Sequence, residues 1–369
     1  MRGKSLVLSA ETLQFSRRYD RVRVQPVLAR VQTLAGLLAE LPVLPETAEA
    51  LDADLRLRSI LGSAALSGNA LPPEQAALVL DAPEPPADPA AREVHNLARV
   101  LRPLTRPRRE FGVLEVAEAH LRKLHAGITE GLPYPASEPG GYRTRSIEVG
   151  DESQGGAYVP PRQVQDIRRL MERFTAWINS EPLRHEPPLL RAAICSFHLA
   201  CIHPFDTGNH RACRALHALI LSAAGLRRIS WLPAIHEHRA PLESFRAFLD
   251  SLRHEMDLTA YLEQHLQGLL DQLTEIKTRL IAPLARLTAE HHLQALLDQR
   301  RVTPRQLDLL HLLQEHGRPL TLQQILATRP FGILYRGRSS HSARRDLLNL
   351  ARLGLIHRSG HAFSPFGGS

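Results

Sequence analysis

Apolar residues recur every three or four positions along most of the chain, which is the spacing of helices that bury one face. This pattern predicts helices over residues 27–41, 47–66, 91–101, 110–126, 161–180 and 255–297. Two further stretches, 187–202 and 211–225, are apolar on most faces, so we expect both to be buried at the centre of the fold. The pattern therefore predicts an all-α protein.

Two segments interrupt the helical pattern. Residues 71–91 are rich in proline and predict a linker. Residues 132–161 contain glycine pairs, prolines and the alternating stretch "YRTRSIEVG", which predict a small β-hairpin flap. We expect four parts: an N-terminal helical region at 1–90, a core at 91–265, a linker helix at 266–300 and a separate small domain at 301–369.

The formal charge of +8 comes almost entirely from arginine, because the 369 residues include only three lysines. Such a balance either favours polyanionic partners or reflects a general arginine bias. Three cysteines without a disulfide framework indicate a reduced, cytoplasmic protein. The N-terminus does not resemble a signal peptide, and no apolar run is long enough to span a bilayer, so we expect no membrane association.

The polar stretch "HPFDTGNHRACR", residues 203–214, lies between the two most apolar helices. Pro204 ends the first helix, and Asn209 is a good N-cap for the second. The free N–H groups at that helix start form an anion site. Arg211 and Arg214 lie on one helical face, where guanidinium groups suit phosphate oxygens, and His203 can accept a proton. The stretch thus predicts phosphate-group transfer with His203 as the base.

This stretch resembles the signature of the Fic family, His-Pro-Phe-x-acid-Gly-Asn-Gly-Arg-x-x-Arg, whose members mostly transfer AMP from ATP to a Ser, Thr or Tyr hydroxyl of a target protein. The flap-like "GGYRTRSIEVG" and the helix after it agree in order with the family, over roughly residues 50–265. The resemblance implies a helical Fic core, ATP as the substrate, a target protein as the partner and His203 as the general base. It leaves a homodimer open.

Carried over by position, the resemblance implies the following roles. Phe205 anchors the loop, and Tyr142, Arg143 and Ile147 belong to the flap that docks the target. The nucleotide-binding positions are Thr207, Gly208, Asn209, His210, Arg211 and Arg214.

Two positions depart from the signature. Thr207 replaces the acid that binds Mg²⁺, and a hydroxyl is a poor ligand for a hard cation, so the sequence does not support a strong Mg²⁺ site. Asp206 is one residue early and should point elsewhere. His210 replaces the second glycine of the phosphate cradle; the Doc-type branch has lysine there and transfers a γ-phosphate. Cys195, His198 and Cys201 fit buried core residues better than a metal site, and we expect no metal cluster.

A further departure concerns the stretch "SILGSAALSGN", which resembles the family's inhibitory helix, Ser-x-x-x-Glu-Gly-Asn. Ser63, Gly68 and Asn69 match, whereas Ser67 replaces the glutamate. In the family that glutamate pairs with the last arginine of the motif, here Arg214. Either the enzyme is unrestrained or it has lost catalysis and needs no restraint.

The C-terminal residues 302–363 predict three helices and a short ribbon, an order that resembles a winged helix-turn-helix. The helix near Ser340 would present Arg344 and Arg345 to DNA. The alternative is a protein-interaction module. For the whole chain we expect a Fic-type protein adenylyltransferase impaired by its degenerate motif. The alternatives are a non-catalytic nucleotide- or DNA-binding regulator and a Doc-like phosphotransferase.

Overall fold

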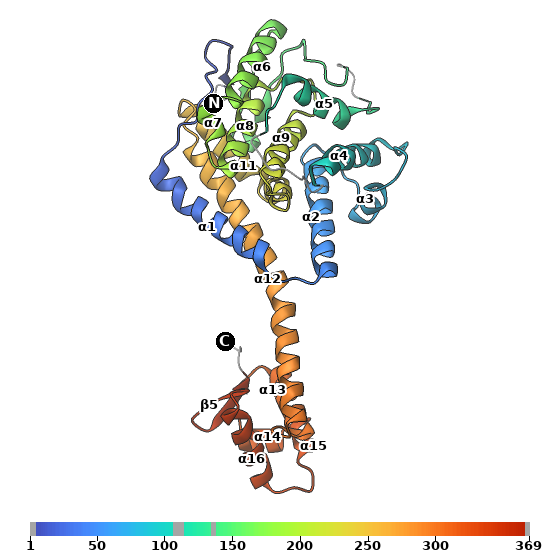
Figure 1. The fold of residues 1–369 in the computed structure, drawn as a ribbon, viewed down its shortest axis with the longest axis vertical. Helices are drawn as coiled ribbons and strands as arrows, with labels where there is room; N and C mark the ends of the chain where they lie inside the picture. The colour runs from blue at the N-terminus through green and yellow to red at the C-terminus, as the bar shows by residue number, and fades with distance from the viewer. Residues whose placement is uncertain (1–4, 106–113, 134–137, 366–369) are drawn as a thin grey trace. The chain divides into compact units, whose positions relative to one another are not determined.

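The computed structural model describes residues 5–105, 114–133 and 138–365 (Figure 1). Residues 106–113, which include the start of the helix expected over 110–126, lie outside the described residues. Contacts divide the chain into two compact units, Met1–Thr278 and Arg279–Ser369. The division falls inside one long helix, α12 (Thr259–Asp298), so it does not test the three boundaries expected between the four parts of the sequence.

The first unit is built almost wholly of helices, which confirms the predicted all-α class with a small hairpin. Its helices are α1 (Arg21–Glu40), α2 (Pro45–Ala65), α3 (Pro73–Val79), α4 (Pro89–Thr105), α5 (Glu118–Thr129), α6 (Val164–Ile178), α7 (Glu181–Arg184), α8 (Pro188–Ile202), α9 (Asn209–Ala223), α10 (Leu232–Arg239), α11 (Pro241–Arg253) and the first part of α12. The short helix α3 lies in the proline-rich segment for which the sequence predicts a linker.

Helices α8 and α9 form the centre of this unit, as their apolar sequences predict. Every residue of α8 after Pro188 is buried, and α9 packs along it. Helices α2, α4 and α5 contact α9, whereas α6 contacts α8. The polar loop between α8 and α9 is therefore surrounded by helices that are far from it in the sequence.

The flap is a small three-stranded sheet in the order β1-β3-β2. Strand β1 (Leu6–Val7) runs parallel to β3 (Gly156–Val159), and β2 (Val149–Asp151) pairs antiparallel with β3. The expected strand over "YRTRSIEVG" is wrong for most of its length, because only Val149 and Gly150 of that stretch lie in β2. Residues 134–137 of the predicted flap segment lie outside the described residues.

Gly150 shows why the flap needs glycine. Its φ is +87°, and a Cβ at this position would lie 2.6 Å from the ring of Phe245 in α11. Any larger residue would push the hairpin away from α11. The glycine thus allows the flap to pack closely against α11.

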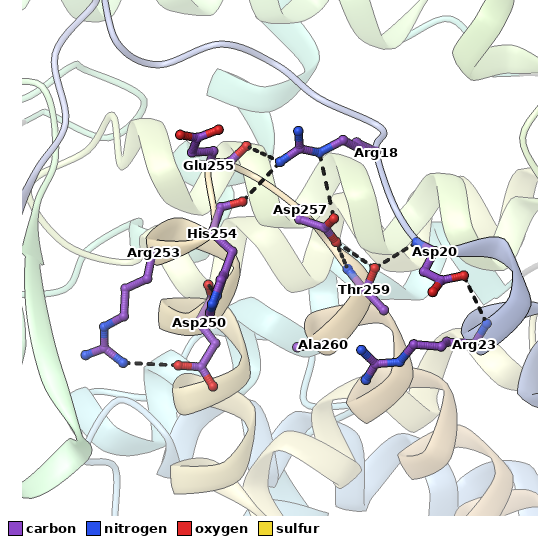
Figure 2. Close-up of a pocket in the computed structure, with 10 residues that line it drawn as sticks. All are labelled: Arg18, Asp20, Arg23, Asp250, Arg253, His254, Glu255, Asp257, Thr259 and Ala260. Carbon is purple, nitrogen blue, oxygen red and sulfur yellow. Dashed lines mark hydrogen bonds and ion pairs between the residues drawn. The ribbon is translucent and has the colours of Figure 1, made fainter.

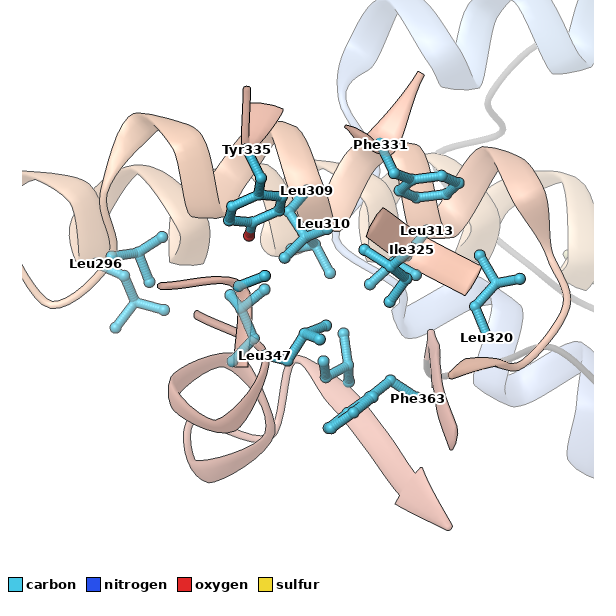
Figure 3. Packing of buried hydrophobic residues seen from close by; sticks show 14 residues of the cluster. Leu296, Leu309, Leu310, Leu313, Leu320, Ile325, Phe331, Tyr335, Leu347 and Phe363 are labelled. Atoms are coloured by element: carbon cyan, nitrogen blue, oxygen red, sulfur yellow. The ribbon is translucent and has the colours of Figure 1, made fainter. Parts of the chain in front are cut away.

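The second unit has its own apolar core. After the end of α12 come α13 (Pro304–His316), β4 (Leu320–Thr321), α14 (Leu322–Ala327), α15 (Phe331–Leu334), α16 (Ser340–Arg352), β5 (Ile356–Ser359) and β6 (Ala362–Pro365). The strands form a sheet in the order β4-β6-β5. Figure 3 shows leucines of α13 and α16 packing with Phe331, Tyr335 and Phe363 into one cluster.

Candidate functional site

The loop between α8 and α9 begins with a strained residue. His203 ends α8 in the left-handed conformation, with φ 49° and ψ 58°, because Pro204 cannot continue the helix. A non-glycine residue at positive φ is uncommon and is often found at functional sites. The loop ends at Gly208, whose φ is +72° and which is the N-cap of α9.

Asn209 was expected to cap α9, and this interpretation is wrong, because Asn209 is the first residue of the helix. Its side chain instead closes the loop on itself. The Asn209 Oδ1 accepts the Phe205 N–H at 2.9 Å, and its Nδ2 donates to the Phe205 carbonyl at 2.7 Å. Phe205 is fully buried, so the pair fixes the shape of the turn.

His125 of α5 also supports the loop, through contacts with Phe205 and Thr207. Its ring stacks on Phe205 with centroids 3.7 Å apart. The His125 Nδ1 accepts the Gly140 N–H at 3.0 Å, so the ring proton lies on Nε2, which donates to the Thr207 carbonyl at 2.9 Å. Burial lowers the pKa of His125 to about 4, so the ring is neutral at pH 7.

The ring of His203 is oriented by Tyr158 of β3. The Tyr158 hydroxyl donates its one proton to the Ala200 carbonyl at 2.8 Å. Its oxygen therefore accepts from the His203 Nδ1, 3.3 Å away. Burial, with positive charge nearby, holds the pKa of His203 well below its usual value. The Nε2 of a neutral His203 is thus left with a lone pair that can accept a proton.

The two arginines of α9 are both paired with carboxylates from other helices. Arg211 forms an ion pair with Glu93 of α4, and only 3% and 8% of these side chains are exposed. Arg214 donates to Glu237 of α10 at 3.1 Å, where the exposed fractions are 9% and 29%. The Arg211–Glu93 pair is therefore buried, whereas the Arg214–Glu237 pair is partly exposed to solvent.

Arg214 lines a cavity of about 280 Å³ beside the loop. Helix α9 contributes His210, Arg214 and His217 to the lining, and other lining residues come from β2 and from Phe245 and Phe248 of α11. The His203 and His210 rings lie 5.3 Å apart, so His203 is next to a residue that lines this cavity. A cavity with aromatic walls, a guanidinium and a neutral histidine suits a nucleotide.

Residues 115–221 match the model of the Fic/DOC family. This segment of the chain is similar to a Fic domain. A protein adenylyltransferase Fic from Drosophila ananassae is 34% identical over 117 residues, which are 31% of this chain and 20% of that protein. The corresponding protein of Drosophila erecta is 32% identical over the same length. The chain thus spans only about a fifth of the length of these curated relatives.

Solved structures show the same fold over a larger part of the chain. A Fic family protein from Desulfovibrio desulfuricans superposes with a TM-score of 0.57 at 20% identity, covering 97% of this chain and 98% of that one. Fic-1 from C. elegans superposes with a TM-score of 0.53 at 19% identity, covering 68% of this chain and 71% of that one.

The substituted positions of the Fic motif leave the loop without a metal ligand. Asp206 pairs with Arg145 at 2.8 Å, its side chain is 3% exposed, and it is not among the residues that line the cavity. Thr207 stands where the family has its acid, and the loop therefore presents no free carboxylate to a metal. These residues do not fit a Mg²⁺ site. Among the described residues, no cluster of His, Cys, Asp or Glu could hold a metal ion.

The inhibitory-helix positions lie against the motif through Ser63 rather than Ser67. The Arg214 Nε donates to the Ser63 Oγ at 2.8 Å, and its Nη2 donates to the Ser63 carbonyl at 3.0 Å. Ser67 is exposed, and α2 ends at Ala65, before the Gly68–Asn69 turn. Asn69 donates to Glu93 at 2.8 Å and so supports the Arg211 pair.

The predicted docking residues of the flap lie in the segment before β2. Arg143 is fully buried and donates to four backbone carbonyls, those of Arg145, Pro161, Ile202 and His203. It joins the flap to the C-terminal end of α8 and has no side-chain surface for a target. Tyr142 donates to Glu118 at 2.7 Å, and Ile147 is half-buried. Their docking role stays a prediction.

A wider cleft lies away from the motif, between Arg18–Arg23 and the junction of α11 and α12 (Figure 2). Its polar groups bind one another: Arg18 donates to the carbonyls of His254 and Glu255 at 3.2 Å, and the Asp20 N–H donates to the Thr259 hydroxyl at 2.8 Å. These hydrogen bonds attach the N-terminal segment to the junction of α11 and α12.

Four residues that shape the site were not predicted from the sequence: Glu93, His125, Tyr158 and Glu237. Glu237 lies in a histidine-rich stretch that begins at His236, and this unusual composition could have marked it as a candidate site residue. Nothing in the sequence around the other three distinguishes them from ordinary helix or strand residues.

Proposed function

We propose that the Fic domain transfers AMP from ATP to a hydroxyl of a target protein. The supporting observation is the orientation of His203, whose Nδ1 side faces the Tyr158 hydroxyl so that Nε2 is left as the base, next to His210 in the cavity wall. In the proposed reaction, Nε2 takes the proton from the target hydroxyl. The hydroxyl oxygen forms a bond to the α-phosphorus, the bond to the bridging oxygen breaks, and pyrophosphate leaves.

The nucleotide would lie in the cavity with its base between the flap and α11 and its phosphates toward the start of α9. The N–H groups at that helix start favour anions. Arg214 would release Glu237 and bind an outer phosphate instead, since this ion pair is partly exposed and can open. Arg211 would act as a structural anchor, because its pair with Glu93 is buried on both sides.

The pairing of Arg214 also bears on whether ATP binding is restrained. Ser67 supplies no carboxylate, yet Arg214 is still paired with one, from α10 instead of the inhibitory helix. We propose that Glu237 restrains ATP binding in place of the missing glutamate. No step is assigned to a metal ion, because the residues of the loop do not fit one.

The test is incubation of the full-length protein with ATP labelled at either the α- or the γ-phosphate. Transfer of the α-label to the chain itself or to a protein substrate, lost in His203→Ala and kept in His185→Ala, would support the proposal. His185 is exposed at the end of α7 and is a matched control. Transfer of the γ-label would favour the Doc-like reaction, and ATP binding without transfer would favour a non-catalytic regulator.

A further inference from the structure

The C-terminal part of the second unit is strongly basic. Between Arg318 and Ser369 the chain contains eight arginines and a single carboxylate side chain, Asp346. A region this basic attracts polyanions whatever its fold. The question is whether the positive charge is directed outward or is neutralised within the unit.

Asp346 neutralises none of the outward charge, because its side chain is directed into the core. Asp346 is 1% exposed. Its carboxylate accepts from Arg305 at 2.8 Å, from Gln306 at 2.9 Å and from the Tyr335 hydroxyl at 3.1 Å. The lone acidic residue of the region therefore serves to tie α13 to α16.

Helix α16 has one apolar face and one basic face. Ala343, Leu347 and Leu350 pack into the apolar cluster of Figure 3. Arg344 and Arg345 are exposed, and within the described part of the chain neither forms an ion pair with a carboxylate. Two such guanidinium groups on a rigid helix can each bind a phosphate oxygen.

Further arginines flank this helix on both sides in the sequence. Arg336 and Arg338, in the segment before α16, are exposed. After α16, the β5–β6 hairpin carries Arg358 in an exposed position, and β5 contacts α16. The hairpin and the helix thus contribute to one basic region of the same small unit.

We infer that α16 and the β5–β6 hairpin form a binding surface for duplex DNA, an activity separate from AMP transfer. The order of the four helices α13 to α16 followed by the β5–β6 hairpin suits a helix placed in a major groove with the hairpin beside it. A protein partner is disfavoured because the exposed part of α16 offers Leu348, at 38% exposed, as its one large apolar group, whereas protein interfaces need an apolar centre.

The test uses the full-length protein and a labelled duplex of mixed sequence, with anisotropy measured from about 50 to 200 mM salt. Arg344→Ala with Arg345→Ala should weaken binding at least tenfold at about 100 mM salt. The slope of log affinity against log salt should fall by about two, one for each lost phosphate contact. Both residues are exposed, so the thermal melting of the variant should match that of the wild type.

The matched control is Arg168→Ala with Arg169→Ala, an adjacent exposed pair on α6 of the first unit. It removes the same charge and should leave the affinity and the slope unchanged. Three results would overturn the inference: no binding at about 50 mM salt, an equal loss in the control, or tighter binding to single-stranded RNA than to the duplex.

Discussion

The Arg214 Nη1 and the Glu237 Oε2 lie 3.1 Å apart, and both residues line the cavity beside the Fic motif. Arg211, one helical turn earlier, is paired with Glu93. The two pairs differ chiefly in burial, because Glu237 is 29% exposed and Glu93 is 8% exposed. That difference predicts opposite consequences for two otherwise identical substitutions.

Glu237→Gln should free Arg214 for a phosphate. A charge-assisted hydrogen bond contributes about 1.5–3 kcal/mol, and after allowance for its partial exposure we expect ATP to bind about tenfold more tightly. Isothermal titration calorimetry measures this directly. Glu243→Gln, an exposed change in the first turn of α11, is the control and should not alter the affinity. Unchanged ATP binding in Glu237→Gln would remove Glu237 as a restraint.

Glu93→Gln should instead destabilise the fold. It leaves the Arg211 guanidinium buried without its counter-charge, and breaking such a pair costs on the order of 3 kcal/mol. The free energy of unfolding from urea titration should fall by about that amount, with no gain in ATP affinity for the folded fraction. A stable variant with tighter ATP binding would mean that Arg211, and not Arg214, is the restrained phosphate ligand.

Thr207→Asp should create the metal affinity that the loop lacks. A carboxylate supplies the charged oxygen that hard divalent cations prefer, and titration of Mn²⁺ into the protein with a non-hydrolysable ATP analogue should show about tenfold tighter binding than in the wild type. Thr207→Asn has the same shape as the aspartate variant without the charge and should behave as the wild type does. If both variants bind Mn²⁺ equally, position 207 does not face the phosphates.

His125 predicts an acid-sensitive fold. Burial lowers its pKa from 6.5 to about 4, so the folded state binds this proton more weakly than the unfolded chain does. Its contribution to stability is present above pH 6.5 and is lost as the pH falls from 6.5 toward 4.

His125→Gln keeps one donor and one acceptor but does not titrate. Over that range its free energy of unfolding should depend less steeply on pH, by up to about 1.4 kcal/mol per pH unit. His120→Gln, an exposed change on the same helix, should keep the wild-type slope. A slope unchanged by His125→Gln would show that this ring does not titrate with unfolding.

The sequence predicted the parts of the site that depend on local chemistry. The positions of Pro204 and Gly208 set the ends of two helices, and the apolar pattern of those helices predicted α8 and α9 as the buried centre. The same local reasoning misplaced the N-cap, because the Asn209 amide is committed to Phe205 instead of to its own helix.

The rest of the site could not be predicted from the sequence because it depends on contacts between distant segments. Glu93 reaches Arg211 across 118 positions, and Tyr158 reaches His203 across 45. Arg143 was expected to face a target, but its guanidinium is buried among backbone carbonyls. An arginine in a polar stretch gives no indication of which carbonyls will surround it after folding.

The part of the chain that the structure describes contains no helix with the length and apolarity needed to cross a bilayer.

The most direct test of the proposed mechanism measures α-label transfer from ATP in four forms: the wild type, Glu237→Gln, His203→Ala and the double variant. The mechanism predicts more transfer in Glu237→Gln than in the wild type, because Arg214 is released. It predicts a loss of about 10²–10⁴-fold whenever His203 is absent, the usual effect of removing a general base. Transfer that persists in the double variant at the level of Glu237→Gln would contradict the mechanism.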